Sequence, residues 1–424
     1  MDLTPLDNVL QEPLLHGQAG SGLRVLVQPR PAFRRTFAAL GVNFGSVDRV
    51  AGADGSPVPE GLAHFLEHKL FEDREGDVSQ RFAELGATTN AMTGFTGTTY
   101  VVSTVEQPRR CLELLLHFVQ DPWFTDALVA KEQGIIAQEI RMYDDDPDWR
   151  TFFGLLGCLY ERHPARDNVA GTVESIAAID AATLRRCYDR FYRPRNLVLA
   201  VAGALPPEEV AAVVQADQAG RPADPCPQHE RGPAGEPEAC RAARWEERLP
   251  VARPRLLLGI KERVLGGDAR ARLRRELETR MLLDLLFGRS SAAWEALYGE
   301  GLVDESFAAS YSTEESFGFT TVGGDTDDPQ RLEARLRETL DGAARRGFDP
   351  AAFRRLRNKL HGALLRALDS PEHVAFTLVG ETFRGCRPFE ELELIASITP
   401  ADLARRLQEH VAPSQLAVAV VRPR

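Results

Sequence analysis

Short apolar runs of strand length alternate with amphipathic runs of helix length along the chain. Residues 197–202 (LVLAVA) and 416–421 (LAVAVV) are continuously apolar, which is typical of strands buried on both faces. Residues 23–27 and 36–44 indicate two more strands, and residues 88–102 read as strand interrupted by glycine. Because strands and helices are mixed without strict alternation, the pattern predicts an α+β fold with helices covering largely antiparallel sheets.

Helix signals occupy three segments of the first 150 residues. Residues 59–72 and 77–85 have the length and apolar spacing of helices. A third, longer helix begins at Thr125 or Asp126, either of which can cap it, and ends before Pro147. The first and third of these helices carry the candidate functional residues considered below.

A gapless internal repeat divides the chain. Residues 176–201 and 395–420 are offset by 219 positions, and ten of the 26 aligned pairs are identical. Each copy predicts a capped helix, a proline-containing turn and a buried strand. Chance similarity is the alternative, but a gapless match that includes proline and isoleucine favours duplication. We therefore expect two related halves, residues 1–220 and 242–424, joined by a linker at 221–241 that is rich in Pro, Gly and charge.

Composition and charge disfavour several classes of protein. With 424 residues, 43 % hydrophobic and 27 % charged, the chain is typical of a globular protein rather than a disordered one. Its net charge of −11 disfavours nucleic-acid binding, which needs an excess of cations to neutralise phosphates. The first residues lack a secretory pattern, and no apolar run approaches the roughly 20 residues of a membrane span. With six cysteines and no CxxC pair, we expect a cytoplasmic protein with reduced thiols and no membrane partner.

The strongest local signal is the sequence His64-Phe65-Leu66-Glu67-His68. In a helix, His64 and His68 lie one turn apart on the same face, where both imidazoles can reach one zinc ion. Glu67 lies on the same side and can act as a general base toward a water at that metal. The alternative is a surface with two histidines and a solvating glutamate. Because the chain has only nine histidines and this helix is apolar enough to be buried, a metal site is favoured.

A third ligand is expected on the long helix. Its apparent inward face has spacings of four and three: Leu128, Glu132, Ile135, Glu139 and Met142. Glu139 is the candidate ligand, and Glu132 can orient a ligand histidine. The alternative is an exposed face on which Glu139 pairs with Arg141 or Tyr143.

Together these residues resemble the pitrilysin/insulinase family of zinc metallopeptidases, whose motif is His-x-x-Glu-His. The resemblance covers essentially the whole chain and is strongest to the YmfH-like bacterial branch. It implies that His64, His68 and Glu139 bind one Zn²⁺ per chain, that Glu67 activates water and that Glu132 supports the site. It also implies two repeated α+β rolls, of which only the first holds metal, since no His-x-x-Glu-His follows residue 220.

The resemblance also implies a mode of substrate binding. In the family, the strand with an Asn-Ala-x-Thr stretch lies at a sheet edge beside the metal and pairs with the substrate backbone. Asn90 and Ala91 are therefore candidate substrate-binding residues, and pairing through the backbone would tolerate many peptide sequences. The alternative is an ordinary strand and turn.

One departure from the family pattern concerns its substrate-binding Arg and Tyr. Leu297 stands at the Arg position and Asp304 at the Tyr position, while Tyr298 and Tyr311 are out of register. A tetrahedral oxyanion needs a hydrogen-bond donor aimed at it. We therefore expect a dimer, either of two copies or with a related chain that lacks the zinc motif and supplies the missing pair.

These observations favour a zinc-dependent endopeptidase that hydrolyses peptides or unfolded polypeptides through a metal-activated water. The alternative is a non-catalytic peptide-binding or assembly subunit of a peptidase-like complex. Stoichiometric zinc distinguishes the two, because a non-catalytic subunit would have no need of His64, Glu67, His68 and Glu139 together.

Overall fold

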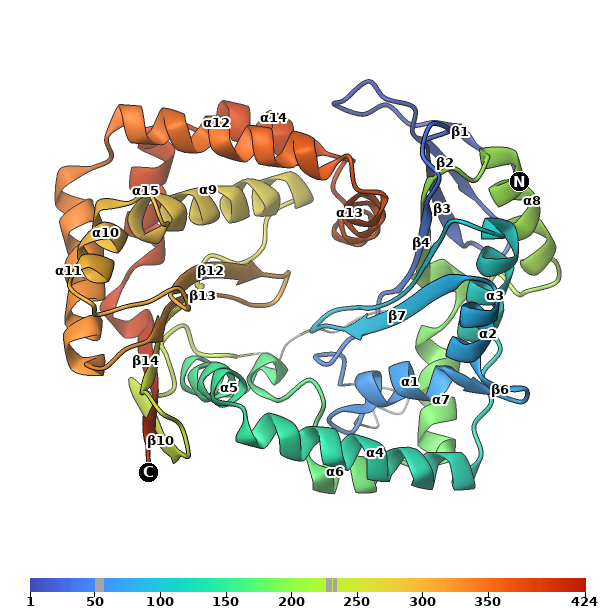
Figure 1. The fold of residues 1–424 in the computed structure, drawn as a ribbon, viewed down its shortest axis with the longest axis horizontal. Helices are drawn as coiled ribbons and strands as arrows, with labels where there is room; N and C mark the ends of the chain where they lie inside the picture. Colours follow the sequence, from blue (N-terminus) through green and yellow to red (C-terminus); the bar gives the residue numbers. More distant parts are fainter. Residues whose placement is uncertain (50–56, 226–230, 232–234) are drawn as a thin grey trace. The chain divides into compact units, whose positions relative to one another are not determined.

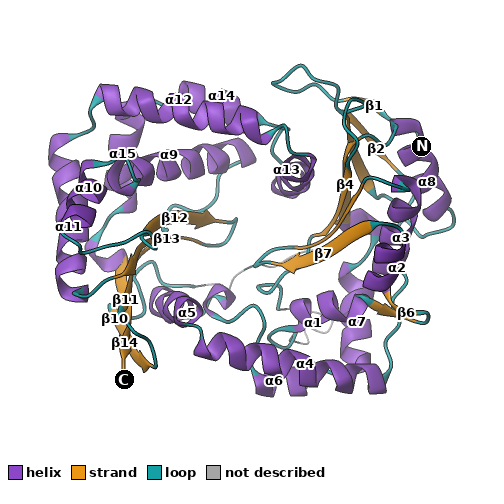
Figure 2. Cartoon of the chain, in the orientation of Figure 1, coloured by secondary structure: helices purple, strands orange, loops and turns teal. Residues whose placement is uncertain are grey.

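The computed structural model describes residues 1–49, 57–225, 231 and 235–424 (Figure 1). It shows a mixed α+β architecture of antiparallel-rich sheets covered by helices, as predicted (Figure 2). The described residues form two compact units. The first comprises Met1–Gln138, Asn168–Glu230 and Leu364–Glu390, and the second comprises Glu139–Asp167, Arg231–Ala363 and Glu391–Arg424. Parts of the expected linker, residues 226–230 and 232–234, lie outside the described residues, and the expected division at 221–241 stays a prediction.

A seven-stranded sheet forms the centre of the first unit. Its strand order is β1 (Thr4–Pro5), β2 (Leu15–Gln18), β3 (Arg24–Pro29), β9 (Leu197–Gly203), β4 (Thr36–Val42), β8 (Thr98–Thr104) and β7 (Ala87–Thr93). All neighbours are antiparallel except β3 and β9. Every residue of β4 and β9 is buried, which explains their continuous apolar sequences. Strand β7 lies at one edge of the sheet and β1 at the other.

Seven helices of the described chain begin in the first unit's first two segments. They are α1 (Leu62–Leu70), α2 (Val78–Glu84), α3 (Pro108–Gln120), α4 (Asp126–Asp145), α6 (Val173–Ala177), α7 (Ala181–Phe191) and α8 (Pro207–Asp217). A small ladder of β5 (Glu72–Asp73) and β6 (Gly76–Asp77) connects α1 to α2. Asp77 and Asp180 accept backbone hydrogen bonds at the starts of α2 and α7. The boundary between the units falls within the continuous helix α4, after Gln138.

The five-stranded sheet of the second unit repeats the order of β3, β9, β4, β8 and β7 in the first unit. Its sheet runs β10 (Arg244–Leu249), β14 (Leu416–Pro423), β11 (Arg255–Lys261), β13 (Gly318–Asp325) and β12 (Ala308–Thr313). Only β10 and β14 are parallel, as are β3 and β9 in the corresponding positions. It contains the helices α5 (Pro147–Leu159), α9 (Ala269–Phe287), α10 (Ala292–Gly299), α11 (Pro329–Arg346) and α15 (Pro400–His410), and most of α12 (Pro350–Ala367) and α14 (Glu390–Ser397).

The two copies of the sequence repeat adopt the same local structure. Helix α7 leads through the 3-10 turn η2 (Pro194–Asn196) to β9, and α15 leads through η3 (Pro413–Gln415) to β14. Thr399 caps α15 and Pro400 is its first residue. The repeat thus marks a helix–turn–strand segment present in each of the two α+β rolls.

Each sheet is covered by a helix from the opposite half of the sequence. Helix α13 (Pro371–Arg384) packs on β4 and β9, and α5 (Pro147–Leu159) packs on β11 and β14. A glycine in each central strand permits this contact. A Cβ at Gly41 would lie 2.4 Å from Val379 Cγ1, and one at Gly259 would lie 2.8 Å from Leu155 Cδ1. Both glycines therefore allow a helix to approach closer than any other residue would.

Among the described residues, no helix combines the length and the apolar character that crossing a bilayer requires.

Candidate metal centre

Helix α1 presents three polar side chains on one face. His64, Glu67 and His68 are half-buried, and the imidazole centroids of His64 and His68 lie 4.6 Å apart. The opposite face is buried and consists of Leu62, Ala63, Phe65, Leu66, Lys69 and Leu70. Spacings of three and four residues place side chains together on a helix. The buried face therefore holds α1 in place while its polar face stays accessible.

The start of α1 depends on a close contact between two backbone segments. Gly61 has φ 81°, and a Cβ there would lie 2.4 Å from the carbonyl oxygen of Ala170. Gly171 has φ 78°, and its Cβ would lie 2.7 Å from the carbonyl oxygen of Glu60. The Ser175 hydroxyl donates to the same Glu60 oxygen at 3.0 Å. These contacts fix the direction in which α1 begins.

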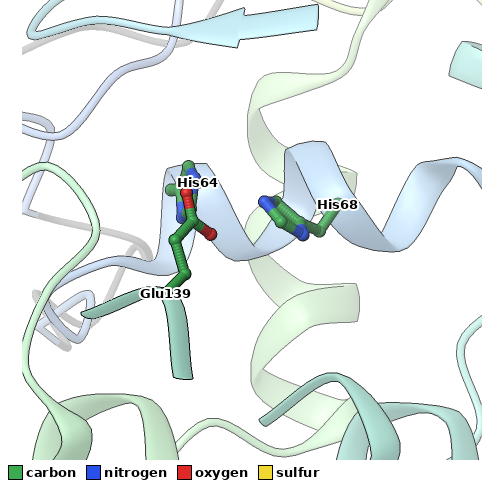
Figure 3. A group of neighbouring side chains, drawn as sticks. All are labelled: His64, His68 and Glu139. Atoms are coloured by element: carbon green, nitrogen blue, oxygen red, sulfur yellow. The ribbon is translucent and has the colours of Figure 1, made fainter. Parts of the chain in front are cut away.

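Glu139 of α4 joins the two histidines of α1. One ligand atom from each of His64, His68 and Glu139 lies within 4.8 Å of the others, and Figure 3 shows Glu139 extending toward the histidines. Two imidazole nitrogens and one carboxylate oxygen form a typical donor set for catalytic zinc, which leaves a fourth position open. The three residues therefore fit the metal that the sequence indicates.

The buried face of α4 differs from the predicted one. The prediction is wrong for Ile135 and Met142, which are 45 % and 62 % exposed. The buried residues of α4 follow a second pattern with spacings of three and four: Val129, Glu132, Ile136 and Ile140. The helix carries two apolar stripes, and only packing decides which of them is covered. Glu132 is buried in either pattern, and Glu139 is half-buried.

Glu67 is held by the end of the edge strand β7. The Thr93 hydroxyl donates to Glu67 Oε2 at 2.5 Å and lies 3.3 Å from the Thr98 hydroxyl. This hydrogen bond orients the carboxylate proposed as the general base. The sequence places Thr93 within the Asn-Ala-x-Thr stretch but does not assign it this contact. Side-chain alternation along a strand is the only signal that could have suggested it.

Glu132 connects a candidate ligand to a buried lysine. Its Oε1 lies 3.2 Å from His68 Nδ1, and its Oε2 lies 3.4 Å from Lys69 Nζ. Burial raises the pKa of Glu132, but the hydrogen bond with His68 and the charge of Lys69 together bring it below its ordinary value. Glu132 is therefore a carboxylate at neutral pH that accepts a hydrogen bond from His68 Nδ1, so that Nε2 is the nitrogen of that ring that would bind metal.

A cavity of about 440 Å³ lies beside Glu67 and His68. Asn90 and Ala91 of β7 line it together with Phe71. The Asn90 side chain is exposed and its Oδ1 accepts from the Ala91 backbone N–H. The two residues predicted to bind substrate thus belong to an edge strand next to the candidate base.

Tyr143 contacts the third candidate ligand. Its hydroxyl donates to Glu139 Oε1 at 2.5 Å, and its ring stacks on Trp149 at a centroid distance of 4.3 Å. The pairing of Glu139 with Tyr143 that the sequence raises as an alternative to ligation is present. It is compatible with ligation, because a carboxylate has a second oxygen and further lone pairs.

In the second unit, the residues at and near the positions of the family's Arg and Tyr make contacts within that unit. Leu297 is 1 % exposed in the core, and Asp304 forms an ion pair with Arg253 at 2.6 Å. Tyr311 is buried and donates to Glu262 at 2.8 Å. Tyr298 is 47 % exposed and stacks on Trp294. None of these four described residues offers an Arg/Tyr pair like that of the family.

The chain matches two family models. The model described as "Insulinase (Peptidase family M16)" matches residues 32–172, which include the candidate metal centre. The model described as "Peptidase M16 inactive domain" matches residues 178–360. The two models follow each other along the chain.

Several known proteins match most of the chain or nearly all of it. The "Uncharacterized zinc protease YmfH" of Bacillus subtilis is 39 % identical over 419 residues, covering 98 % of both chains. A second protein of that organism, "Uncharacterized zinc protease YmxG", is 24 % identical and covers 82 % of this chain and 83 % of its own. A crystal structure of an M16-like peptidase from Alicyclobacillus acidocaldarius has a TM-score of 0.93 at 38 % identity, covering 99 % of this chain and all of that one.

Proposed function

Because the chain belongs to the insulinase family, peptidase family M16, we propose that it is a zinc-dependent endopeptidase that hydrolyses peptides or unfolded polypeptides. The observation that supports this most is the gathering of His64, His68 and Glu139 within 4.8 Å, with Glu67 on the same helical face. His64, His68 and Glu139 would hold one Zn²⁺ per chain. Relatives named as zinc proteases support the same activity.

Each residue around the site has a separate proposed role in hydrolysis. When bound, zinc supplies a Lewis acid that polarises the scissile carbonyl and makes a water more acidic. Glu67 takes a proton from the attacking water and delivers it to the departing amine nitrogen. Thr93 orients the Glu67 carboxylate through a hydrogen bond to Oε2. Glu132 keeps the His68 ring in one tautomer and one orientation.

The edge strand β7 is the proposed binding site for the substrate backbone. An extended peptide that adds to this edge would lie next to Glu67, above the cavity that Asn90 and Ala91 line. Recognition through backbone hydrogen bonds requires an unfolded segment and reads little of its sequence. Peptides and unfolded chains are therefore the proposed substrate class.

A partner chain is proposed to complete the site. Leu297 and Asp304 occupy the positions of the family's Arg and Tyr, and both are engaged elsewhere. A homodimer, or a heterodimer with a related chain that lacks the zinc motif, would bring a second donor for the oxyanion. The second candidate function is a non-catalytic peptide-binding subunit, which the absence of that pair favours.

Metal content and hydrolysis test the proposal together. The purified chain is expected to contain one zinc per polypeptide and to cleave unstructured peptides in a chelator-sensitive manner. Cleavage is expected to rise when a co-purifying related chain is added. Zinc near zero would favour the non-catalytic subunit, and full activity of the isolated monomer would contradict the need for a partner.

A further inference from the structure

We propose that Lys69 is a positioning residue of the metal centre, whose ammonium group holds the Glu132 carboxylate against the ring of His68. This inference rests on the proposed zinc site and concerns a residue that lies directly after a candidate ligand in the sequence. It assigns a role to a cation that the hydrolytic mechanism does not use.

Lys69 is a fully buried cation with two carboxylate partners. Its side chain is 0 % exposed, and its Nζ lies 2.7 Å from Glu72 Oε2 and 3.4 Å from Glu132 Oε2. Removing an ammonium group from water is costly unless charged partners compensate for the loss. An aliphatic residue would fill this position of α1 without that cost. The lysine therefore needs an explanation beyond packing.

Glu132 stands between the lysine and the candidate ligand. It is itself 7 % exposed, and it gives one oxygen to each neighbour: Oε1 to His68 Nδ1 at 3.2 Å and Oε2 to Lys69 Nζ at 3.4 Å. Two contacts on two different oxygens fix the plane of the carboxylate. Without the contact at Oε2, the carboxylate could rotate, and its hold on the His68 ring would weaken.

The positive charge of Lys69 also affects the electrostatics around the Glu132 carboxylate. Glu67, Glu132 and Glu139 bring three carboxyl groups close to two histidines. The buried ammonium lowers the repulsion among these groups, in surroundings where charges are poorly screened. This lowers the electrostatic cost of placing the Glu132 side chain beside the candidate ligands.

Glu72 is the second carboxylate that holds the ammonium group of Lys69. Glu72 accepts from Lys69 through Oε2 and from Lys131 through Oε1, at 2.7 Å and 3.1 Å. The Lys131 side chain is 58 % exposed, whereas that of Lys69 is buried. The two lysines share Glu72, but only Lys69 reaches Glu132. Lys131 is therefore a matched control: it has the same charge and shares the Glu72 contact, but does not touch the carboxylate that orients His68.

Zinc affinity in a double-mutant cycle tests the proposal without any measurement of hydrolysis. Lys69→Met is expected to weaken zinc binding about 10-fold, the low end of the range for partners that orient ligands. Glu132→Gln is expected to weaken it at least as much, and Lys69→Met is expected to add little in the Glu132→Gln background, since Lys69 acts through Glu132. Lys131→Met is expected to stay within about 2-fold of the wild type. Competition with a chromogenic chelator gives these constants.

Cobalt substitution provides a second readout at the ligands themselves. The visible absorption of the Co²⁺-loaded chain is expected to shift in Lys69→Met and to remain unchanged in Lys131→Met, because only the first alters the orientation of His68. Lys69→Gln can still donate a hydrogen bond and is expected to fall between the wild type and Lys69→Met. It also carries the test if Lys69→Met does not fold.

The outcomes separate this inference from the proposed function. Wild-type zinc affinity in folded Lys69→Met, or an equal loss in the Glu132→Gln background, would overturn the role of Lys69 alone. Failure of both Lys69 variants to fold would show a purely structural requirement and would overturn it too. A wild-type chain that binds no zinc would overturn the proposed function, and the role of Lys69 with it.

Discussion

The ring nitrogen Nδ1 of His68 lies 3.2 Å from Oε1 of Glu132, two residues that are 64 positions apart in the sequence. The contact joins α1 to α4, the two helices that carry all three candidate ligands. Because Nδ1 faces a carboxylate, Nε2 is the nitrogen of this ring that is left for metal. A single contact thus links the packing of two helices to the chemistry of the site.

Thr93→Val is expected to slow hydrolysis without affecting metal binding. Valine keeps the shape and strand preference of threonine but cannot donate to Glu67 Oε2. Freeing the general base is expected to lower kcat about 10-fold, because one hydrogen bond contributes on the order of 1 kcal/mol, with KM and zinc content unchanged. Thr88→Val, at an exposed position of the same strand, is the control. A rise in KM at constant kcat would contradict an effect on the base.

Tyr143→Phe is expected to weaken zinc binding. The substitution removes the hydroxyl that donates to Glu139 Oε1 at 2.5 Å but retains the ring stacked on Trp149. Loss of a partner that orients a ligand typically costs 10-fold or more in metal affinity. Chelator competition measures the change, and Tyr298→Phe in the second unit is expected to have no effect. Equal zinc affinity in both variants would show that Glu139 needs no support from Tyr143.

Gly41→Ala and Gly134→Ala are expected to change stability in opposite directions. A Cβ at Gly41 would lie 2.4 Å from Val379 Cγ1, so α13 must shift and the protein is expected to lose about 1–3 kcal/mol. A Cβ at Gly134 meets nothing within 4 Å inside α4, so alanine is expected to stabilise the helix by about 0.5–1 kcal/mol. Denaturant unfolding of both variants checks the sign. A Gly41→Ala variant as stable as the wild type would contradict the packing of α13 on β4.

His163 is expected to make stability depend on pH below neutrality. Burial lowers the pKa of His163 to about 4, while in the unfolded chain it is about 6.5. Between these values the unfolded chain binds the proton more readily, so stability falls as pH falls from 6.5 to 4. The loss is expected to reach about 2–3 kcal/mol at pH 4.

His163→Asn is the variant that isolates this effect. Asparagine does not titrate and can still accept the Ala165 backbone N–H that His163 Nδ1 accepts at 3.0 Å. The difference in unfolding free energy between wild type and variant is expected to shrink or reverse as the pH is lowered from 6.5 to 4. His361→Asn, at an exposed helix position, is expected to leave the pH dependence unchanged. Parallel curves for wild type and His163→Asn would refute the assignment.

Much of the fold could be predicted from the sequence, because its elements have local signals. The sequence predicts strands at residues 36–44 and 197–202, where the structure has β4 and β9, the two strands of their sheet in which every residue is buried. It could not be predicted that α13 covers the sheet of the first unit and that α5 covers the sheet of the second unit. Periodicity indicates that a helix has an apolar face but not which sheet that face covers. Gly41 and Gly259 allow these helices to pack closely, but a glycine in the sequence does not indicate which helix will contact it.

In the candidate site, too, local features could be predicted and contacts between separate elements could not. The spacing of His64 and His68 within one helix is local, so their proximity follows from helix geometry alone. The contacts of Thr93 and Lys69 with site carboxylates join separate elements, and a sequence pattern does not indicate which side chains meet. On α4, the sequence pattern wrongly predicts that Ile135 and Met142 are buried, because the helix has two apolar stripes and exposed apolar residues are common.

The role of Glu67 as the base of a zinc peptidase is best examined with Glu67→Gln. Glutamine has the same shape and can keep the contact with Thr93, but it cannot take a proton from water. The measurement is hydrolysis of an unstructured peptide by the zinc-loaded variant, with any required partner present, beside Glu84→Gln from the exposed end of α2. We expect wild-type zinc content and a loss of hydrolysis of at least about 100-fold in Glu67→Gln, with Glu84→Gln unaffected. Hydrolysis at the wild-type rate by Glu67→Gln would contradict this role.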